Sequence, residues 1–156
     1  VVGDSHGDFA AMRQVAALAG SVDIWLHTGD FCRDGLYLAS LSPAPLLAVA
    51  GNCDAGGAAK PDEFFEMAGF FIWMTHGHRH GVKQDTQDLA DWAGRYEADI
   101  VIYGHTHQAA TWSQSGIHFF NPGSVFQPRR GQQRSFGLLE LQENPRKLSF
   151  QLISLP

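Results

Sequence analysis

The sequence predicts an α/β fold with a largely parallel sheet, and two observations support this. Short apolar runs are each followed by glycine and polar residues, which is typical of buried strands. Segments with helical periodicity separate the early runs, and strands that alternate with helices form mainly parallel sheets. No linker interrupts the 156 residues, so we expect one domain over residues 1–156. The six apolar runs begin at Val1, Ile24, Leu46, Phe70, Ile100 and Ile117.

Two segments carry the helical pattern. Asp8 is placed to cap a first helix, and Gly20 stands just past the last apolar position of that segment. A second helix is predicted over residues 84–96. The apolar positions at helical spacing are Phe9, Met12, Val15, Ala16 and Ala19 in the first segment, and Leu89, Trp92, Ala93 and Tyr96 in the second.

The pattern changes after Ser124. Two apolar runs, residues 136–141 and 148–153, flank the turn sequence Glu143-Asn144-Pro145-Arg146. Two such runs joined by a short polar turn predict an antiparallel hairpin, which we expect to close the domain.

Composition and charge narrow the function classes. The formal net charge of −5 argues against a general nucleic-acid-binding surface, because affinity for nucleic acid comes mainly from Lys and Arg on phosphates. The first apolar stretch is only Val1-Val2, so we expect neither a signal peptide nor a membrane helix. That stretch resembles the end of a strand and no Met precedes it, so we expect a few N-terminal residues to be missing. Two cysteines cannot form a disulfide framework and suit a reducing cytosol, so we expect a cytoplasmic protein.

The unusual feature of the composition is eight histidines, most of which follow apolar runs together with Asp and Asn. In open α/β sheets the functional crevice lies outside the carboxyl ends of the strands, so we expect these clusters at one edge. Strand termination alone would explain the glycines but not the choice of Asp, His and Asn. Oxygen and imidazole ligands suit Mn, Fe, Zn or Ni ions, and seven of them fit two ions with one shared carboxylate. The candidates are Asp4, His6, Asp30, Asn52, His76, His105 and His107.

Five motifs in this order resemble those of the calcineurin-like metallophosphoesterase superfamily. They are Asp-x-His at 4–6, Gly-Asp at 29–30, Gly-Asn-x-Asp at 51–54, His-Gly-His at 76–78 and Gly-His-Thr-His at 104–107. The chain length, the "GNCD" stretch and the "NPGS" stretch at 121–124 make the chain most similar to the small prokaryotic phosphodiesterase branch. The resemblance runs from Gly3 to about Arg129. It implies a four-layer αββα sandwich with a dinuclear metal site at the C-terminal ends of the strands.

The resemblance also implies a ligand assignment and a reaction. Asp30 would bridge two divalent transition metal ions, of which Mn is the first choice and Ni, Fe or Zn the alternatives. Two such ions lower the pKa of a bridging water, and the resulting hydroxide attacks phosphorus in line with the leaving alkoxide. We therefore expect a metal-dependent phosphodiesterase that acts on a small phosphodiester. The first ion would be held by Asp4, His6 and His107, and the second by Asn52, His76 and His105.

Other polar residues near the motifs receive separate assignments. We take Asn52, His78 and Asp54 as candidate catalytic residues, and His78 and Arg129 as candidates for substrate binding. His78 is equally compatible with a solvated loop histidine, and Arg129 with an ordinary exposed arginine. Asp54 is expected to orient loop amides or to form an Asx turn.

Three further histidines receive no catalytic role. His27 is expected to support the site or the fold, His80 to lie at the surface and His118 to lie in the sheet. Asn121 and Ser124 belong to the tight turn of the "NPGS" stretch and are expected to support the site.

Cys53 stands where much of the superfamily has a histidine that protonates the leaving group. A cysteine-based phosphatase needs an arginine-bearing phosphate loop just downstream, whereas Cys53 is followed by Asp-Ala-Gly-Gly-Ala-Ala. Asn52 already fills the ligand position. We therefore expect Cys53 to be a bystander, and substrates with good leaving groups to be favoured.

Two other functions remain open. The retromer subunit of the same superfamily keeps the fold as an interaction scaffold and has lost parts of the metal site, whereas all seven ligand positions are present here. A phosphomonoesterase would need a donor able to protonate a poorer leaving group, which the sequence does not obviously offer. The natural substrate and the oligomeric state, a homo-oligomer included, do not follow from these residues.

Overall fold

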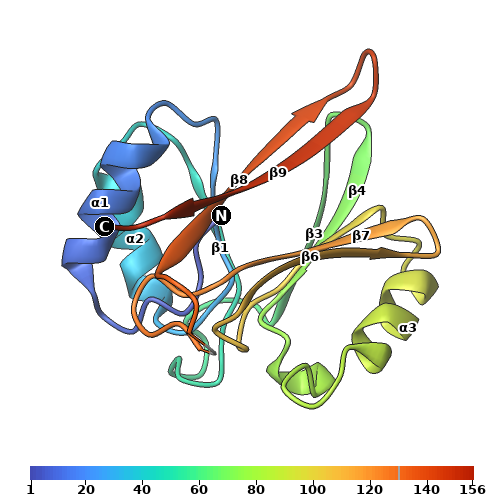
Figure 1. Ribbon diagram of the computed structural model, residues 1–156, viewed down its shortest axis with the longest axis horizontal. Helices are drawn as coiled ribbons and strands as arrows, with labels where there is room; N and C mark the ends of the chain where they lie inside the picture. The colour runs from blue at the N-terminus through green and yellow to red at the C-terminus, as the bar shows by residue number, and fades with distance from the viewer. Residues whose placement is uncertain (130) are drawn as a thin grey trace.

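Three apolar cores separate four layers in the computed structural model, which describes residues 1–129 and 131–156. Helices α1 (Phe9–Ala19) and α2 (Cys32–Ser40) form one outer layer, and α3 (Gln87–Arg95) lies on the opposite side of the molecule (Figure 1). Two β layers lie between them, so the αββα sandwich implied by the resemblance is confirmed. The strands are β1 (Trp25–His27), β2 (Leu46–Ala48), β3 (Asp62–Met67), β4 (Phe70–Thr75), β5 (Ile100–Ile102), β6 (Ala109–Gln114), β7 (Ile117–Pro122), β8 (Ser135–Gln142) and β9 (Lys147–Ser154).

One β layer is a five-stranded mixed sheet in the order β3-β4-β5-β7-β6. Its three inner strands β4, β5 and β7 are parallel, and the outer strands β3 and β6 pair antiparallel with their neighbours. The prediction of a largely parallel arrangement therefore holds for the centre of this sheet. The sequence pattern did not predict the two outer strands.

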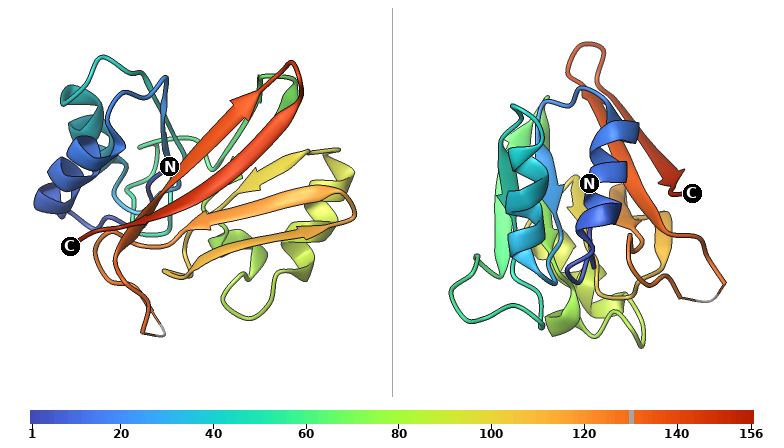
Figure 2. Two further views of the ribbon diagram at one scale, coloured as in Figure 1. Left: turned by 45° about the horizontal axis from the view of Figure 1, so that its top comes forward. Right: turned by 90° about the vertical axis from the view of Figure 1, so that its left-hand side faces the viewer.

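The other β layer is assembled from three parts of the chain. β1 and β2 pair in parallel, and Val2 forms a parallel bridge to His27. Val1 exchanges two backbone hydrogen bonds with Gly137 of β8, at 2.7 and 2.9 Å. β8 pairs antiparallel with β9 over its whole length, which confirms the predicted hairpin. The run Val1-Val2 thus joins the β1–β2 pair to the hairpin, beside which the N-terminus lies in Figure 2.

Side chains that alternate along the strands fill different cores, as the two-residue period of a strand requires. In β4, Ile72 and Met74 enter the core between the two β layers, while Trp73 enters the core under α3. In β1, Leu26 faces the core between the layers and Trp25 faces α1 and α2. The near-continuous apolar runs of the sequence therefore mark strands that are covered on both faces.

The first predicted helix is confirmed at both ends. Asp8 caps α1 by accepting a hydrogen bond of 2.9 Å from the amide of Ala11, and Gly20 follows the helix with a φ of +65°. The second helix, α3, starts at Gln87 rather than at residue 84. The amide of Gln84 bonds to the carbonyl of Gly81, and Asp85 accepts from the amide of Gln87. Residues 84–86 are therefore used in a turn that leads into the helix. No helix in the described part of the chain is long and apolar enough to cross a membrane.

Candidate metal centre

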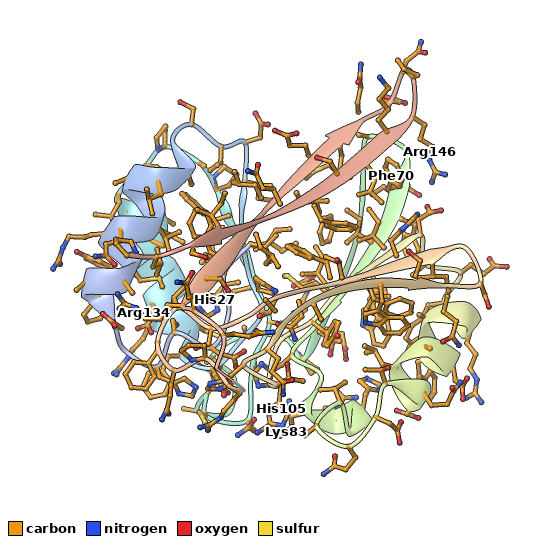
Figure 3. The ribbon with its side chains drawn as sticks, viewed as in Figure 1. His27, Phe70, Lys83, His105, Arg134 and Arg146 are labelled. Carbon is orange, nitrogen blue, oxygen red and sulfur yellow. The ribbon has the colours of Figure 1, made fainter. Side chains whose placement is uncertain are left out.

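The predicted ligands lie in loops that leave the C-terminal ends of strands at one edge of the sandwich. Asp4 and His6 follow the run Val1-Val2, and Asp30 follows β1. His76 follows β4 and His105 follows β5, and the latter is labelled at the lower edge of the molecule in Figure 3. Because these strands run in parallel, their loops meet at a common edge, as expected for an α/β sheet.

Six of the seven predicted ligands form two groups that share Asp30. In each group, one ligand atom from every residue lies within 4.8 Å of the others. The first group is Asp4, His6, Asp30 and His107, and the second is Asp30, His76 and His105.

The first group contains two carboxylates and two imidazoles. The Nε2 atoms of His6 and His107 are 3.2 Å apart. His6 Nε2 lies 3.6 Å from Asp30 Oδ2, and His107 Nε2 lies 3.5 Å from Asp4 Oδ1. All of these atoms therefore point toward one small volume.

The second group contains the shared carboxylate and two imidazoles. His76 Nε2 lies 3.4 Å from Asp30 Oδ1 and 3.2 Å from Nδ1 of His105. The two oxygens of Asp30 thus face different groups, Oδ1 toward His76 and Oδ2 toward His6. A carboxylate in this position is suited to bridge two cations.

Several residues of the centre have a left-handed backbone conformation, which is strained for residues other than glycine. Nine non-glycine residues in the described chain have a positive φ, and five of them are predicted ligands. Asp and His are more often found in the left-handed region than most residues, but each such residue still costs about 1 kcal/mol or more. Strain of this kind persists where the surrounding structure imposes it, and it gathers at functional sites. The five ligands are Asp4, His6, Asp30, His105 and His107.

Glycines of the motifs give the ligand loops room to approach one another. A Cβ atom on Gly51 would overlap the carboxylate of Asp30. Gly29 has a φ of +100°, and a side chain there would meet His76. These close approaches explain why the stretches before Asp30 and Asn52 contain glycine.

Backbone carbonyls hold two of the imidazoles in an orientation suited to metal binding. Nδ1 of His76 lies 2.7 Å from the carbonyl oxygen of Thr28, and Nδ1 of His107 lies 2.7 Å from that of Gln127. A carbonyl oxygen can only accept, so Nδ1 carries the proton in both rings. The Nε2 atoms that face the centre then have free lone pairs when the rings are neutral, as metal ligation requires.

Asp4 shows that the first group lacks a positive partner of its own. Its Oδ2 accepts a hydrogen bond of 3.0 Å from the amide of His105, but its buried Oδ1 has no hydrogen-bond partner in the described chain. Burial raises the pKa of Asp4 to about 7, an effect that the charge of His76 only partly opposes. A buried carboxylate oxygen without a partner is costly, and a cation beside it would remove the cost. The donor set, carboxylate oxygens and imidazole nitrogens, therefore fits divalent transition metals.

The imidazoles differ in their protonation. Burial lowers the pKa of His76, but the hydrogen bond that its ring donates to Asp30 and the charge of Asp4 outweigh burial and raise the pKa overall. The pKa of Asp30 is held below its usual range, because the hydrogen bond and charge of His76 outweigh burial. Burial, assisted by the charges of His76 and Lys83, lowers the pKa of His105 to about 4. His107 also has a lowered pKa, mainly because of burial. The two carboxylates thus favour positive charge at His76, the position beside which a metal ion would lie.

The "GNCD" stretch surrounds Asp30 from the side of α2. The amide of Cys53 donates to Asp30 Oδ1 at 2.9 Å. Asp54 accepts from the amides of Cys32 and Gly51, at 2.6 and 2.8 Å, so it orients loop amides as expected. Cys53 is an exposed residue, but partial desolvation of its sulfur and then the charge of Asp30 raise the pKa of the thiol, so it is held neutral.

Asn52 is the predicted ligand whose side chain has a different partner. It is exposed, and its Nδ2 lies 3.4 Å from the sulfur of Cys53. Its assignment to the second group therefore stays a prediction.

His78 and Lys83 lie on the side of the second group. The ring centroid of His78 is 5.3 Å from that of His76 and 6.0 Å from that of His105. His78 opens η1 (His78–His80), and its pKa is lowered by burial and by the charge of His76. Lys83 extends beside His105 in Figure 3, and its charge contributes to the lowered pKa of His105. Lys83 belongs to no sequence motif, so its position beside His105 could not be predicted from the sequence.

The supporting residues occupy the predicted positions, with one exception. His27 is fully buried and contacts Ser5 Oγ at 3.1 Å, and His118 lies on β7. The prediction that His80 lies at the surface is wrong: it is 9% exposed, and its Nδ1 lies 2.8 Å from Asp88 of α3. The contact with Asp88 explains how a histidine can be buried here. The sequence pattern did not predict this burial, because apolar periodicity does not reveal polar pairs between elements.

The "NPGS" turn supports two ligand loops. Asn121 donates to the carbonyl of Gly104 and to Thr106 Oγ1, both at 3.1 Å. Ser124 donates to the carbonyl of Asp4 at 2.8 Å. Arg129 is exposed, and its amide bonds to the carbonyl of His107 at 2.9 Å, so its side chain starts close to the first group.

Fold and site together define a class of protein: an αββα sandwich that carries a metal-binding centre at its strand ends. The sequence matches the family model of the calcineurin-like phosphoesterase superfamily domain over residues 1–144. The chain belongs to this superfamily, as its motifs predicted.

Two bacterial relatives have similar sequences over most of their length. The probable metallophosphoesterase YsnB of Bacillus subtilis is 31% identical over 153 residues, which cover 96% of this chain and 88% of that protein. Phosphodiesterase YfcE of Escherichia coli K12 is 29% identical over 161 residues, which cover 88% of this chain and 84% of that protein.

Two solved structures share the fold. A predicted phosphoesterase of Streptococcus pneumoniae superposes with a TM-score of 0.72 at 29% identity, covering 99% of this chain and 95% of that chain. Zinc-bound Vps29 of Entamoeba histolytica superposes with a TM-score of 0.76 at 22% identity, covering 98% of this chain and 96% of that chain. The second likeness concerns the fold alone.

Proposed function

We propose that this chain is a metal-dependent phosphodiesterase that hydrolyses small phosphodiesters at a dinuclear centre. The observation that carries the proposal is the pair of ligand groups that share Asp30, one of which includes an Asp4 oxygen without a partner in the described chain. Membership in the superfamily supports a hydrolase acting on phosphoric esters. The relationship to a protein named a phosphodiesterase supports the diester.

The proposed roles of the ligands follow from where their atoms point. Asp30, whose two oxygens face different groups, would hold both ions. Asn52 would complete the second group only after its side chain turns away from the sulfur of Cys53. Bound divalent ions lower the pKa of water toward neutrality and neutralise charge on the phosphoryl group, and manganese is our first choice. The first group is then Asp4, His6 and His107, and the second is Asn52, His76 and His105.

Residues at the rim bind and protonate the substrate. We assign His78 to the phosphoryl oxygens or the leaving-group oxygen, because its ring lies next to His76 and His105. We assign Arg129 to binding a phosphate oxygen, because the N–H groups of a guanidinium can form paired hydrogen bonds with phosphate. Asp54 acts through the loop amides that it holds rather than on the substrate. Cys53 is a neutral thiol and a poor proton donor at neutral pH, so diesters with good leaving groups react fastest.

The decisive experiment is a metal-and-substrate screen. Protein stripped of metal is reconstituted in turn with Mn, Ni, Mg and Zn, and each form is assayed on phosphodiesters, phosphomonoesters and cyclic nucleotides. We expect about two equivalents of metal per chain, activity on diesters, and loss of that activity with a chelator.

Three outcomes separate the alternatives. Full diesterase activity in the metal-free protein would overturn the proposal. Activity confined to monoesters would favour a phosphomonoesterase. Metal binding without activity on any ester would favour an interaction scaffold.

We also propose a cytoplasmic location. Both cysteines are free and the thiol of Cys53 is exposed, which suits a reducing compartment. Fractionation of cells that produce the protein would test this.

A further inference from the structure

Two phenylalanine rings flank the ligand His6. The ring centroid of His6 is 5.4 Å from that of Phe31 and 5.7 Å from that of Phe126. Phe126 is 45% exposed, although burial of its ring would be favourable. We call Phe31 and Phe126 together the aromatic wall.

The exposure of Phe126 does not result from a loose attachment. Ser124 Oγ accepts from the amides of Phe126 and Gln127, at 3.1 and 2.9 Å, and donates to the carbonyl of Asp4 at 2.8 Å. The carbonyl of Gln127 accepts from Nδ1 of the ligand His107 at 2.7 Å. The segment that carries Phe126 is therefore tied to both sides of the first group.

Phe31 is held beside the same ligand at the expense of backbone strain. It follows Asp30 directly and has a φ of 73°, a region that an aromatic residue rarely adopts. The guanidinium of Arg33 lies 5.0 Å from the centre of its ring. Strained residues persist where the surrounding structure imposes them, and they gather at ligand sites.

Another phenylalanine, Phe64, is exposed to a similar extent, but its ring packs against tryptophan and tyrosine side chains of the fold, whereas in the described chain that of Phe126 does not. Phe64 is 41% exposed, but its ring stacks at 6.2 Å on Trp73 and meets Tyr96 edge-on at 4.9 Å. The aromatic neighbour of Phe126 in the described chain is a candidate metal ligand. The ring of Phe126 therefore lies next to the candidate metal centre rather than against the core.

We propose that the aromatic wall stacks against a planar aromatic group on the alcohol that the phosphodiester retains after hydrolysis, so that nucleoside phosphodiesters are the preferred substrate class. This inference rests on the proposed function. A phosphodiester bound at the two groups would carry its ester groups next to the candidate ligands, and His6 is the candidate ligand that the wall flanks. A flat nucleobase gains stacking energy on an aromatic side chain, whereas a small alkyl group does not.

The test compares two esters that release the same p-nitrophenolate. Thymidine 5′-(p-nitrophenyl phosphate) retains a nucleoside, and ethyl p-nitrophenyl phosphate retains an alkyl group. The manganese-loaded wild type, Phe126→Leu and the matched control Phe64→Leu are assayed on both. We expect kcat/KM of the wild type to favour the nucleoside ester about tenfold, and Phe126→Leu to lose most of this preference while Phe64→Leu keeps it.

A binding measurement makes the test independent of turnover. Calorimetric titration with thymidine 5′-monophosphate and with ethyl phosphate should show about tenfold tighter binding of the nucleotide by the wild type, and a much smaller ratio for Phe126→Leu. Equal affinity for both ligands, or the same ratio in Phe126→Leu and Phe64→Leu, would overturn the aromatic wall. If the nucleotide preference appears in binding but neither ester is hydrolysed with any metal, the proposed function fails and the aromatic wall stands.

Discussion

The two ligand groups at the strand ends share Asp30 but differ in charge and surroundings. The first group has a second carboxylate, Asp4, and lies beside the two phenylalanine rings of the aromatic wall. The second group relies on the shared carboxylate, and the positive charge of Lys83 acts on its imidazole His105. Cation affinity rises with the number of anionic ligands, so the two groups should bind metal unequally, the first more tightly. We therefore expect the first group to retain its ion, and the second group, beside Lys83, to face the anionic phosphate of the proposed substrate.

The largest effect should come from Asp30→Asn, which removes the carboxylate that both groups use. Asparagine tolerates the left-handed backbone of this position and can still accept from the amide of Cys53. We expect kcat/KM to fall about a thousandfold, equivalent to about 4 kcal/mol, with loss of metal from both groups. The measurements are steady-state kinetics and metal content by elemental analysis.

His78→Ala is the comparison for Asp30→Asn. It should reduce activity far less, because His78 is assigned to the substrate and not to the ions. Equal and mild losses from the two substitutions would remove Asp30 from the centre of the mechanism.

Asp4→Asn should affect the first group selectively. We expect the tighter of two metal-binding steps to weaken about 10- to 100-fold, a range seen when groups around a metal are altered. Calorimetric titration with manganese would resolve the two steps, and Asp23→Asn, at an exposed position away from the centre, serves as the control. If the weaker step changed instead, the comparison of the two groups would be reversed.

The same substitution should change how stability depends on pH in the metal-free protein. Burial raises the pKa of Asp4 from 3.8 to about 7, so the folded state binds this proton more tightly than the unfolded state. The stability from this carboxyl is fully present below about pH 4 and is lost as the pH rises through about 7. Asp4→Asn should therefore gain stability relative to the wild type at pH 8 but not at pH 4, by up to about 4 kcal/mol. Urea unfolding at the two pH values measures the difference.

Lys83→Ala should produce a smaller effect on the second side. Loss of a positive charge near His105 should weaken attraction of the anionic diester and raise KM about threefold at low salt, with the effect fading as ionic strength rises. Lys60→Ala is the control, because Lys60 is exposed and pairs with Glu63 at 3.3 Å. A change in kcat that persists at high salt would instead give Lys83 a part in the chemical step.

Cys53→Ala should have the smallest effect, within about twofold, because we assign the neutral thiol no role as a nucleophile or a metal ligand. Cys53→His should add an imidazole near the leaving group and raise turnover of alkyl esters more than of nitrophenyl esters, by well under the ~10²-fold that general acids typically supply. Turnover of both ester types at matched metal loading decides this. Complete loss of activity in Cys53→Ala with both metals bound would show that the thiol takes part in the reaction.

The sequence predicted the parts of the fold that carry strong local signals. α1 has a capping aspartate, a regular apolar face and a terminal glycine, and the structure uses all three. The six apolar runs all entered the β layers, because strands covered on both faces need continuous apolar sequence. The αββα order of the layers came from the motif resemblance and not from periodicity.

The missed elements have weaker local signals. α2 begins after Phe31, whose left-handed backbone is not a typical helix start, and contains Gly35. β3 and β6 are the edges of their sheet and mix polar with apolar residues, so their pairing is decided by β4 and β7. Local propensity cannot reveal partners that come from elsewhere in the chain.

The site follows the same rule. The ligand residues were identifiable because they stand in five short motifs that each follow an apolar run and that together resemble those of a known superfamily. The left-handed backbone at Asp4, His6, His105 and His107 was not predicted. The sequence did not identify Phe31, Phe126 or Lys83 as part of the site. Their relevance comes from their spatial neighbours, His6 for the two phenylalanines and His105 for the lysine. The burial of His80 escaped prediction for the same reason, since it depends on Asp88.

The left-handed backbone of five candidate ligands lowers the stability of the metal-free fold, although the same residues are needed to bind metal. At each of these positions glycine would relieve strain, and at the buried Asp4 it would also remove an unpaired charge, so the most stable sequence for this backbone is not the one that binds metal. A lineage selected for the shape of its surface alone would gain stability by giving up ligands one after another. The sandwich would survive each loss, because its three cores lie elsewhere. In the metal-free protein the loss of these ligands should therefore raise stability, whereas a bound metal should reverse the order because it stabilises the folded state that holds it.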